Sequence, residues 1–286
     1  MESGASLLPH RSIVEIKGPD ALSFLQGLVT NDVERAVTGQ AVYAALLTPQ
    51  GKVVTDFMIV AVDGGYWLDC AASSASDLAA RLKKYKLRAK VEIADKSGEL
   101  AVAALDESKA IAGEVVAFAD PRLAALGWRI IGRRAGLEAA LQAAGYRMAP
   151  VADCERRRIA LGVPDSADIV PETTFPLDCN FEELNGVDFK KGCYVGQELT
   201  ARMKHRASAR KRFLPVSADV ELPAPGTTVT LGEAPIGELK SSIDRQGLAL
   251  IRLDRLGEAK EAVADGVIIR IGAPAYPLNL SQGDPS

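Results

Sequence analysis

The most specific signal in this sequence is the stretch KGCYVGQELTAR, which occupies residues 191–202. Its cysteine, Cys193, comes just after Lys190 and Lys191, and nearby ammonium groups favour the thiolate form of a partly exposed cysteine. Glycines at positions 192 and 196 bracket the thiol, so the backbone can turn tightly or approach a ligand closely. We predict that Cys193 is the reactive residue. The alternative is a buried packing residue, which is the commoner role of a cysteine considered alone.

Positive charge accumulates directly after this stretch. From Gln197 the pattern is helical, and Glu198, Arg202 and Arg206 stand four residues apart, where ion pairs can form along one face. The basic residues of the segment 202–212 are Arg202, Lys204, His205, Arg206, Arg210, Lys211 and Arg212. Such a segment attracts a polyanion, for which RNA and a polyglutamylated folate are the candidates. Phe213 is its one aromatic neighbour, so RNA is the weaker candidate, and a solvated helix face is the alternative to both.

Two aspartates are candidate ligands for the edge of a pterin ring. Asp56 follows a turn at residues 48–51, and Asp178 ends the run TFPLD at residues 174–178. A carboxylate accepts paired N–H bonds from such a ring edge, although capping a turn is the commoner role of an isolated aspartate. The sequence contains no Ser-His-Asp arrangement, no P-loop and no dinucleotide-binding glycine motif.

Apolar periodicity predicts an α+β fold in which strands outnumber helices. The predicted strands of the first half occupy residues 41–47, 53–62, 66–70, 91–94, 100–105, 115–118 and 128–131. Predicted helices begin near residues 21, 76, 137 and 197, and Ser76 or Asp77 caps the second of them. A further charged helix is predicted after Pro150 and contains residues 155–158. The turn at 48–51 makes the first two strands a hairpin. A long irregular segment at 165–189 is of the kind that carries function.

The pattern changes beyond residue 211. Proline and glycine there separate short strands at residues 213–216, 227–231, 236–241, 247–253 and 267–271. Short, evenly spaced strands predict a small C-terminal β-barrel. We therefore predict two domains, residues 1–210 and 211–286.

Composition narrows the class of protein. With 286 residues, 48% of them hydrophobic, the chain is long enough to bury a large core. A formal charge of −3 argues against binding nucleic acid with the whole surface. Four dispersed cysteines and two histidines predict no zinc or cluster cage and no stably bound metal. No apolar stretch approaches the roughly 20 residues of a membrane helix. Residues 1–11 lack the features of a leader, so we expect a cytoplasmic protein without membrane contact.

Residues 191–202 resemble the signature of the YgfZ family, which is related to the glycine-cleavage T-protein. The resemblance extends over nearly the whole chain, through residues 24–27, 30–32, 46–52, 171–173, 176–178, 185–188 and 248–255. It implies a folate-binding, T-protein-like domain of antiparallel sheets and helices, made of two interleaved subdomains, followed by a C-terminal β-barrel. These parts are expected to surround a central folate cavity.

The resemblance also implies a function. Members of the YgfZ family are tetrahydrofolate-binding factors for the assembly or repair of [4Fe–4S] proteins, including radical enzymes that modify transfer RNA. Cluster-assembly factors and client proteins are therefore the expected partners. By position, Cys193 matches the motif cysteine and Asp178 the pterin-facing carboxylate. Arg158 and Asp56 fall in segments that line the folate cavity. The residues expected to shape the site around the thiol are Tyr194, Gln197, Glu198 and Arg202.

Two alternative functions remain open. The T-protein carries two adjacent aspartates where this sequence has Thr55 and Asp56, and it lacks the Lys-Gly-Cys element, which disfavours aminomethyl transfer. A folate-dependent one-carbon transferase that uses Cys193 is nevertheless the first alternative, so the existence of catalytic turnover is left open. A protein that binds transfer RNA through the 202–212 segment is the second.

Overall fold

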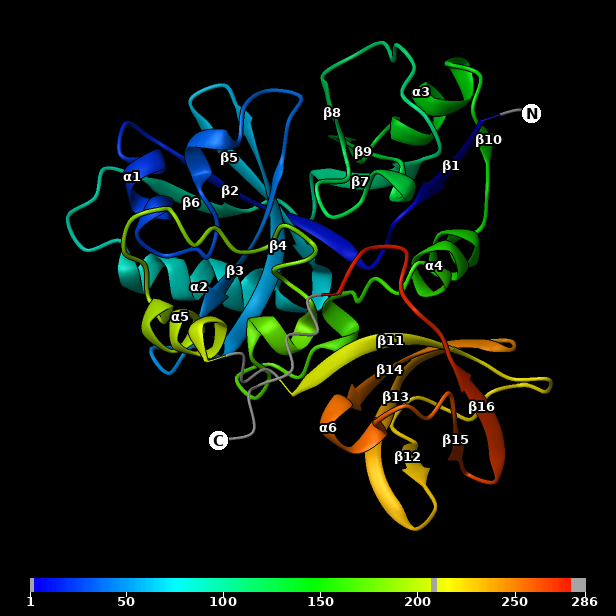
Figure 1. Ribbon diagram of the computed structural model, residues 1–286. Coiled ribbons are helices and arrows are strands. Elements are labelled where there is room, and N and C mark those ends of the chain that lie inside the picture. Colours follow the sequence, from blue (N-terminus) through cyan, green and yellow to red (C-terminus); the bar gives the residue numbers. More distant parts are fainter. Residues whose placement is uncertain (1–2, 207–209, 279–286) are drawn as a thin grey trace.

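The computed structural model describes residues 3–206 and 210–278, which form two five-stranded sheets and a closed barrel (Figure 1). The first sheet has the order β10-β1-β7-β9-β8 and contains β1 (Gly4–Leu7), β7 (Leu100–Leu105), β8 (Val115–Ala119), β9 (Trp128–Arg133) and β10 (Arg147–Met148). The second sheet has the order β3-β4-β5-β2-β6 and contains β2 (Arg11–Lys17), β3 (Val42–Leu47), β4 (Val53–Val62), β5 (Gly65–Ala71) and β6 (Glu92–Asp95). The predicted α+β fold is confirmed.

The closed barrel follows in the chain and has the order β11-β14-β13-β12-β15-β16. Its strands are β11 (Lys211–Ser217), β12 (Thr228–Leu231), β13 (Ala234–Ile243), β14 (Gln246–Arg252), β15 (Glu261–Ala264) and β16 (Val267–Ile271). The predicted C-terminal barrel is confirmed, and closure leaves no exposed strand edge along its circumference. The strand β15 was not predicted, because four residues between Glu261 and Ala264 give too short a pattern.

Six α-helices and five short 3₁₀ helices connect the strands of the described residues. The α-helices are α1 (Ala21–Gln26), α2 (Ala75–Tyr85), α3 (Leu137–Ala143), α4 (Val151–Ala160), α5 (Gln197–His205) and α6 (Leu253–Leu256). The 3₁₀ helices are η1 (Val33–Arg35), η2 (Ala72–Ser74), η3 (Ala124–Leu126), η4 (Ser166–Asp168) and η5 (Pro176–Cys179). Figure 1 shows the two sheets side by side above the barrel, with α4 between the first sheet and the barrel.

The two sheets interleave along the chain because β1 and β2 belong to different sheets. Neither strand was predicted. β2 lies between β5 and β6, and Ile13, Val14 and Ile16 are completely buried. A strand that is buried on both faces loses the alternation of apolar and polar residues by which strands are recognised.

Local turn chemistry predicted the first hairpin correctly, but not the start of α2. β3 and β4 form the predicted hairpin, and the amide of Gly51 donates to the carbonyl of Thr48 at 2.8 Å. The predicted cap of α2 is wrong: the helix begins at Ala75, so Ser76 and Asp77 lie inside its first turn. The predicted irregular segment is present as well and contains η4 and η5.

The longest helix of the described residues, α2, has 11 residues. No helix within residues 3–206 and 210–278 has both the length and the hydropathy that a membrane span requires.

Candidate functional site

Cys193 lies in the loop that precedes α5, and its side chain is exposed. The residue that follows it, Tyr194, is 8% exposed and packs in the core between the sheets. The ammonium group of Lys191 lies 5.2 Å from the centre of the Tyr194 ring. The thiol is therefore carried at the surface by a loop whose neighbouring side chains are fixed in the interior.

Lys191 holds this loop against the segment after α1. Its Nζ donates to the carbonyls of Val29 and Asn31, both at 2.7 Å. Asp188 turns the loop by accepting the amides of Lys190 and Lys191 at 2.7 and 3.1 Å. Burial lowers the pKa of Lys191 to about 8. The lysine that was expected to act on the thiol thus binds two backbone carbonyls.

A contact between two backbones fixes the other end of the loop. Gly196 has a φ of +82°, and a Cβ atom there would lie 2.5 Å from the carbonyl oxygen of Thr48 and 3.1 Å from Gly51 Cα. Only glycine allows the loop to pack this closely on the β3–β4 turn. The amide of Val195 also donates to the carbonyl of Gly27 at 3.3 Å.

Replacement of Gly196 by alanine should destabilise the protein by about 3 kcal/mol, because the backbone conformation and the contact with Thr48 both oppose a side chain. Gly192 is the matched control. It lies on the other side of Cys193, and a Cβ there would meet nothing within 4 Å. Urea denaturation of Gly196→Ala and Gly192→Ala measures the difference. Equal stability of the two variants would contradict the packing that we describe.

Further segments of the sequence signature meet at the same place. The hydroxyl of Thr30 donates to the carbonyl of Gly186 at 2.6 Å. The side-chain amide of Asn31 donates to the carbonyls of Tyr43 and Asn185 at 2.7 and 2.6 Å. Residues 24–27, 30–32, 46–52 and 185–188 are thereby joined around the loop that carries Cys193. These four signature segments, distant in sequence, build one platform for the thiol.

Helix α5 extends the platform with charged residues. Glu198 and Arg202 form the predicted ion pair at 2.6 Å, but both side chains are mainly exposed, so it adds little stability. Gln197 begins the helix and is half-buried. In the 202–212 segment, Lys204 pairs with Glu182 and Arg212 is buried. Residues 207–209 of this segment lie outside the described residues. The other exposed basic side chains of the segment are His205, Arg206, Arg210 and Lys211.

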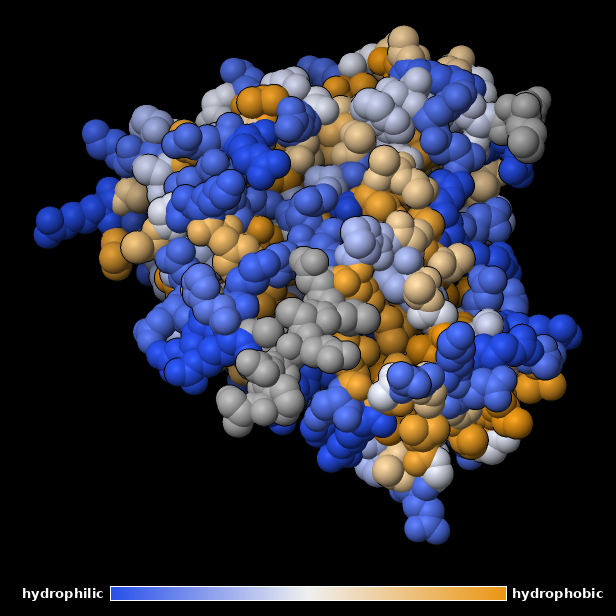
Figure 2. All heavy atoms as spheres, viewed as in Figure 1, coloured by the Kyte–Doolittle hydropathy of each residue, from blue (hydrophilic) through white to orange (hydrophobic). Residues whose placement is uncertain are grey.

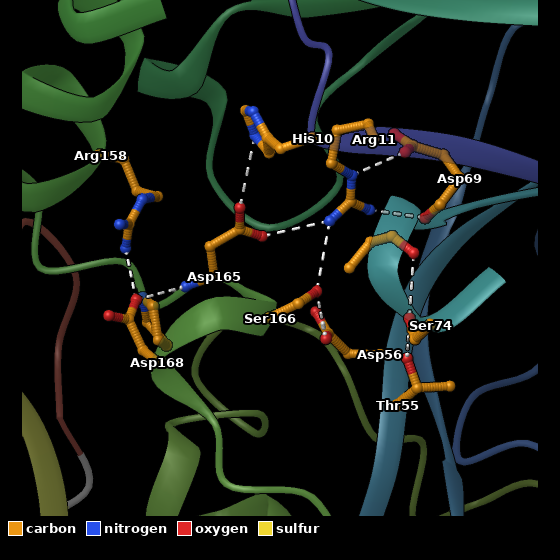
Figure 3. A network of polar contacts seen from close by, with 12 residues as sticks. His10, Arg11, Thr55, Asp56, Asp69, Ser74, Arg158, Asp165, Ser166 and Asp168 are labelled. Carbon is orange, nitrogen blue, oxygen red and sulfur yellow. Dashed lines mark hydrogen bonds and ion pairs between the residues drawn. The ribbon is translucent and has the colours of Figure 1, made fainter. Parts of the chain in front are cut away.

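A second constellation is a buried network of ion pairs, and Figure 3 shows the part of it around Arg11 and Asp165. Arg11, at the start of β2, donates to Asp69 on β5 at 2.8 Å and to Asp165 at 3.2 Å. Arg129, on β9 of the first sheet, donates to the other oxygen of Asp69 at 2.8 Å. Asp69 is completely buried and is shared by guanidinium groups from both sheets.

Opposite charges keep this network ionised. Burial opposes the charge of Arg11, but the carboxylates of Asp69 and Asp165 more than offset this and raise its pKa. Burial likewise opposes ionisation of Asp165, yet Arg11 and Arg158 hold its pKa well below the usual range. Removal of one partner from a buried, hydrogen-bonded ion pair leaves the other charge buried and unpaired, which strongly destabilises the fold.

Two of the predicted folate contacts, Asp56 and Arg158, meet the network at the turn formed by η4. Asp56 accepts from the hydroxyls of Tyr43 at 3.0 Å and Ser166 at 2.6 Å. Burial, followed by the charge of Asp165, raises the pKa of Asp56. Arg158 donates to Asp168 at 2.6 Å. Both predicted residues are therefore bonded to neighbours on the same turn.

The third predicted folate contact, Asp178, lies elsewhere, on η5 beside the start of β11. Its carboxylate accepts the backbone amide of Lys211, and burial raises its pKa. Within the described residues, no hydrogen bond or ion pair joins Asp178 to Asp56 or to Arg158. The structure brings together two of the three residues that the resemblance assigned to folate.

The arrangement does not fit tetrahydrofolate as it stands. The cavity beside Arg158 measures about 40 Å³, whereas pockets for ligands of this size measure roughly 300–1,000 Å³. A larger cavity of about 440 Å³ lies beside α3, and its lining, which includes Leu8, Val102 and Gln142, contains none of the predicted folate contacts. Both carboxylate oxygens of Asp56 already accept hydrogen bonds, from Tyr43 and from Ser166, and the residue is buried.

One group of side chains in the network has the composition of a metal site. His10, Glu155 and Asp165 each offer a ligand atom, and these atoms lie within 4.8 Å of one another. However, Arg158 already binds Glu155 at 2.7 Å and Arg11 binds Asp165 at 3.2 Å. A divalent cation would have to compete with these guanidinium groups for the carboxylates. The three side chains are therefore part of the ion-pair network and not a separate metal site.

Sequence reasoning missed the residues that form this network, above all Arg11 and Asp69. A signal for Asp69 was present in the sequence, because it is an acidic residue within the apolar WLDCA run of β5. A carboxylate that is buried in such a strand needs a buried partner. Asp120 and Arg122 form another missed pair, with two bonds of 3.0 and 2.8 Å. Their spacing of two residues in a loop carries no such signal.

Comparison with known proteins identifies two family segments in the chain. Residues 8–146 match the family described as GCVT N-terminal domain, and residues 210–276 match the CAF17 C-terminal beta-barrel domain. The fold is similar to the crystal structure of glycine cleavage system aminomethyltransferase T from Bartonella henselae, with a TM-score of 0.78 over 96% of this chain and 86% of that chain. At 15% sequence identity this likeness shows the fold alone.

Two curated relatives are similar in sequence. The iron–sulfur cluster assembly factor IBA57, mitochondrial, of Homo sapiens is 32% identical over 93% of this chain and 82% of the relative. The IBA57 homolog of Neurospora crassa, also named as mitochondrial, is 34% identical over 79% of this chain, and the match spans 57% of that relative's length. These names correct the prediction of a cytoplasmic protein, which is wrong. The absence of leader features in residues 1–11 does not determine a compartment.

Proposed function

This chain belongs to the family of the iron–sulfur cluster assembly factor IBA57, and on that premise we propose that it supports the assembly or repair of [4Fe–4S] proteins. The predicted membership of an iron–sulfur assembly family with a T-protein-like fold is thereby confirmed at this level. The observation that carries the proposal is the exposed thiol of Cys193 on a platform built from the signature segments.

The chemistry of a thiol suits this function. Cysteine thiolates are the ligands of iron–sulfur clusters and good nucleophiles towards sulfur. An exposed thiol on a rigid loop can be reached by another protein while its position stays constant. Tyr194 supports the loop from the interior, and Glu198 and Arg202 place a polar pair at the start of α5.

The test of the proposal is restoration of cluster enzymes in a strain that lacks the protein. We expect low activity of [4Fe–4S] enzymes in that strain, including a radical enzyme that modifies transfer RNA, and recovery when the native chain is supplied. An enzyme without a cluster is the control and should not change. Full activity of the cluster enzymes in the deficient strain would contradict the proposal.

Tetrahydrofolate binding is the finer part of this proposal and derives from the resemblance. Binding requires that the cavity of about 40 Å³ widen and that the hydroxyl of Ser166 leave Asp56. We therefore expect Ser166→Ala to bind tetrahydrofolate roughly tenfold more tightly than the native chain, since a competing hydrogen bond of about 1.4 kcal/mol is removed. Asp56→Asn should bind it most weakly. Calorimetric titration measures all three proteins.

The variants separate the two parts of the proposal. If neither the native chain nor Ser166→Ala binds tetrahydrofolate, folate is discarded and the assembly function stands. If Asp56→Asn and the native chain bind tetrahydrofolate equally well, Asp56 does not contact the folate. Asp178→Ala tests the other predicted carboxylate, because loss of binding in this variant and not in Asp56→Asn would assign the pterin ring to Asp178. Glu114→Gln, an exposed change that no predicted contact involves, is the control.

A further inference from the structure

The last residues of α2 and the loop that leads from it to β6 form a strongly basic exposed segment that the proposed function does not use. Residues 83–90 read KKYKLRAK, and we call them the 83–90 turn. Its cations are Lys83, Lys84, Lys86, Arg88 and Lys90. Among residues 3–206 and 210–278, no ion pair or hydrogen bond is found for the charged groups of these five side chains. The turn therefore presents five uncompensated positive charges.

Leu87, at the middle of the turn, is unfavourable for the fold in two ways. Its side chain is 89% exposed, and its backbone has a φ of +43°. An apolar side chain gains nothing from water, and the left-handed conformation is one that residues other than glycine and asparagine rarely adopt. Such strain points to a function outside the folded chain. Tyr85, at 39% exposure, adds an aromatic group beside it.

The short helix α1 connects this turn to the site of Cys193. At its start, Asp20 accepts the amide of Lys90 at 2.7 Å. At its end, Gly27 accepts the amide of Val195 at 3.3 Å. Six residues of helix span about 9 Å, so the turn and the Cys193 loop are held at opposite ends of one rigid element.

The turn and the Cys193 loop also face the same side of the molecule. Figure 1 shows both at its left edge, and in Figure 2 that edge carries hydrophilic side chains with hydrophobic ones among them. A protein interface of ordinary size buries about 800 Å² on each partner, a patch roughly 30 Å across. A partner that covers Cys193 would therefore also cover the turn.

We propose that the 83–90 turn is a docking surface for an acidic protein, namely the partner that meets Cys193. This inference rests on the proposed function of that thiol. Five unpaired cations favour an anionic surface, and Leu87 requires an apolar pocket, which a protein offers and a phosphate backbone does not. A bilayer would press the neighbouring Cys193 loop against lipid headgroups and exclude client proteins from it.

The first experiment uses the restoration of [4Fe–4S] enzymes in the deficient strain. Leu87→Asn suits it because asparagine tolerates the left-handed conformation, so the fold should be no less stable. We expect it, and the double variant Lys84→Glu with Lys86→Glu, to restore roughly tenfold less activity than the native chain. Lys260→Glu, an exposed reversal in the barrel, is the matched control and should restore fully.

Comparison with Cys193→Ser separates the role of the docking surface from the role of the thiol. If the turn variants restore activity fully and Cys193→Ser does not, the docking surface is refuted and the function of the thiol stands. If Cys193→Ser also restores activity fully, the thiol is not the group that acts, and the docking surface loses its premise although the assembly function stands. A lowered thermal midpoint of Leu87→Asn would refute the claim that this leucine does not serve the fold.

The second experiment identifies the class of partner. A photoreactive p-benzoylphenylalanine in place of Tyr85 should cross-link to a protein with an isoelectric point below about 5, and the charge reversal at Lys84 and Lys86 should abolish the adduct. Vesicles of phosphatidylglycerol and purified transfer RNA are the competing probes. Binding of either one that the same reversal abolishes, without a protein adduct, would overturn the proposal.

Discussion

Cys193→Ser should lower the restoration of [4Fe–4S] enzymes to the level of the strain that lacks the protein. Serine keeps the size of the side chain, but its hydroxyl is neither a ligand for cluster iron nor a nucleophile comparable to a thiolate. Because the side chain is exposed and its loop is held by Lys191 and Gly196, the variant should fold like the native chain. Enzyme assays and a thermal denaturation curve measure the two effects.

Cys154 supplies the matched control for this prediction. It is a half-buried free cysteine on α4, and burial raises the pKa of its thiol, which makes it less reactive. Cys154→Ser should therefore restore the client enzymes fully. Activity retained by Cys193→Ser, or lost equally by both variants, would show that the exposed thiol is not the group that acts.

Asp69→Asn should lower the free energy of unfolding by about 3–5 kcal/mol, the cost of breaking a buried ion pair from one side. The substitution removes the charge that Arg11 and Arg129 share, while both guanidinium groups stay buried. The lost stability should come from weaker association of the two sheets, because Arg11 and Arg129 belong to different sheets. Urea denaturation, extrapolated linearly, gives the free energy.

An exposed ion pair is the control for this second prediction. Arg133 and Glu114 lie 2.9 Å apart, but their side chains are 72% and 80% exposed. Glu114→Gln should change the free energy of unfolding by no more than about 0.5 kcal/mol, because water screens such a pair. Similar losses for Asp69→Asn and Glu114→Gln would contradict the assignment of the buried network as a joint between the sheets.

The expected folate cavity illustrates how a resemblance can predict positions without predicting their surroundings. Asp56 and Arg158 do lie near one another, as the resemblance implied, because both contact the η4 turn. Their polar atoms are satisfied by Ser166, Tyr43 and Asp168. Whether a cavity is open depends on every neighbouring side chain, and those neighbours come from distant parts of the chain.

By itself the sequence determined the features that arise from neighbouring residues. The β3–β4 hairpin follows from the turn at 48–51, α5 and its Glu198–Arg202 pair follow from a spacing of four, and the barrel follows from short strands with Pro and Gly between them. Cys193 was singled out by its lysine and glycine neighbours. Each of these signals acts over a few residues, where backbone geometry dictates the outcome.

Only the tertiary structure decided how these features meet. Lys191 binds carbonyls 162 and 160 residues away, and Gly196 packs on the turn at 48–51. Arg11 binds Asp69 and Asp165, which are 58 and 154 residues away in the chain. Such partners leave no periodic pattern, because burial selects them by position in space rather than by spacing along the chain. For the same reason, the platform beneath Cys193 became visible only in the folded protein.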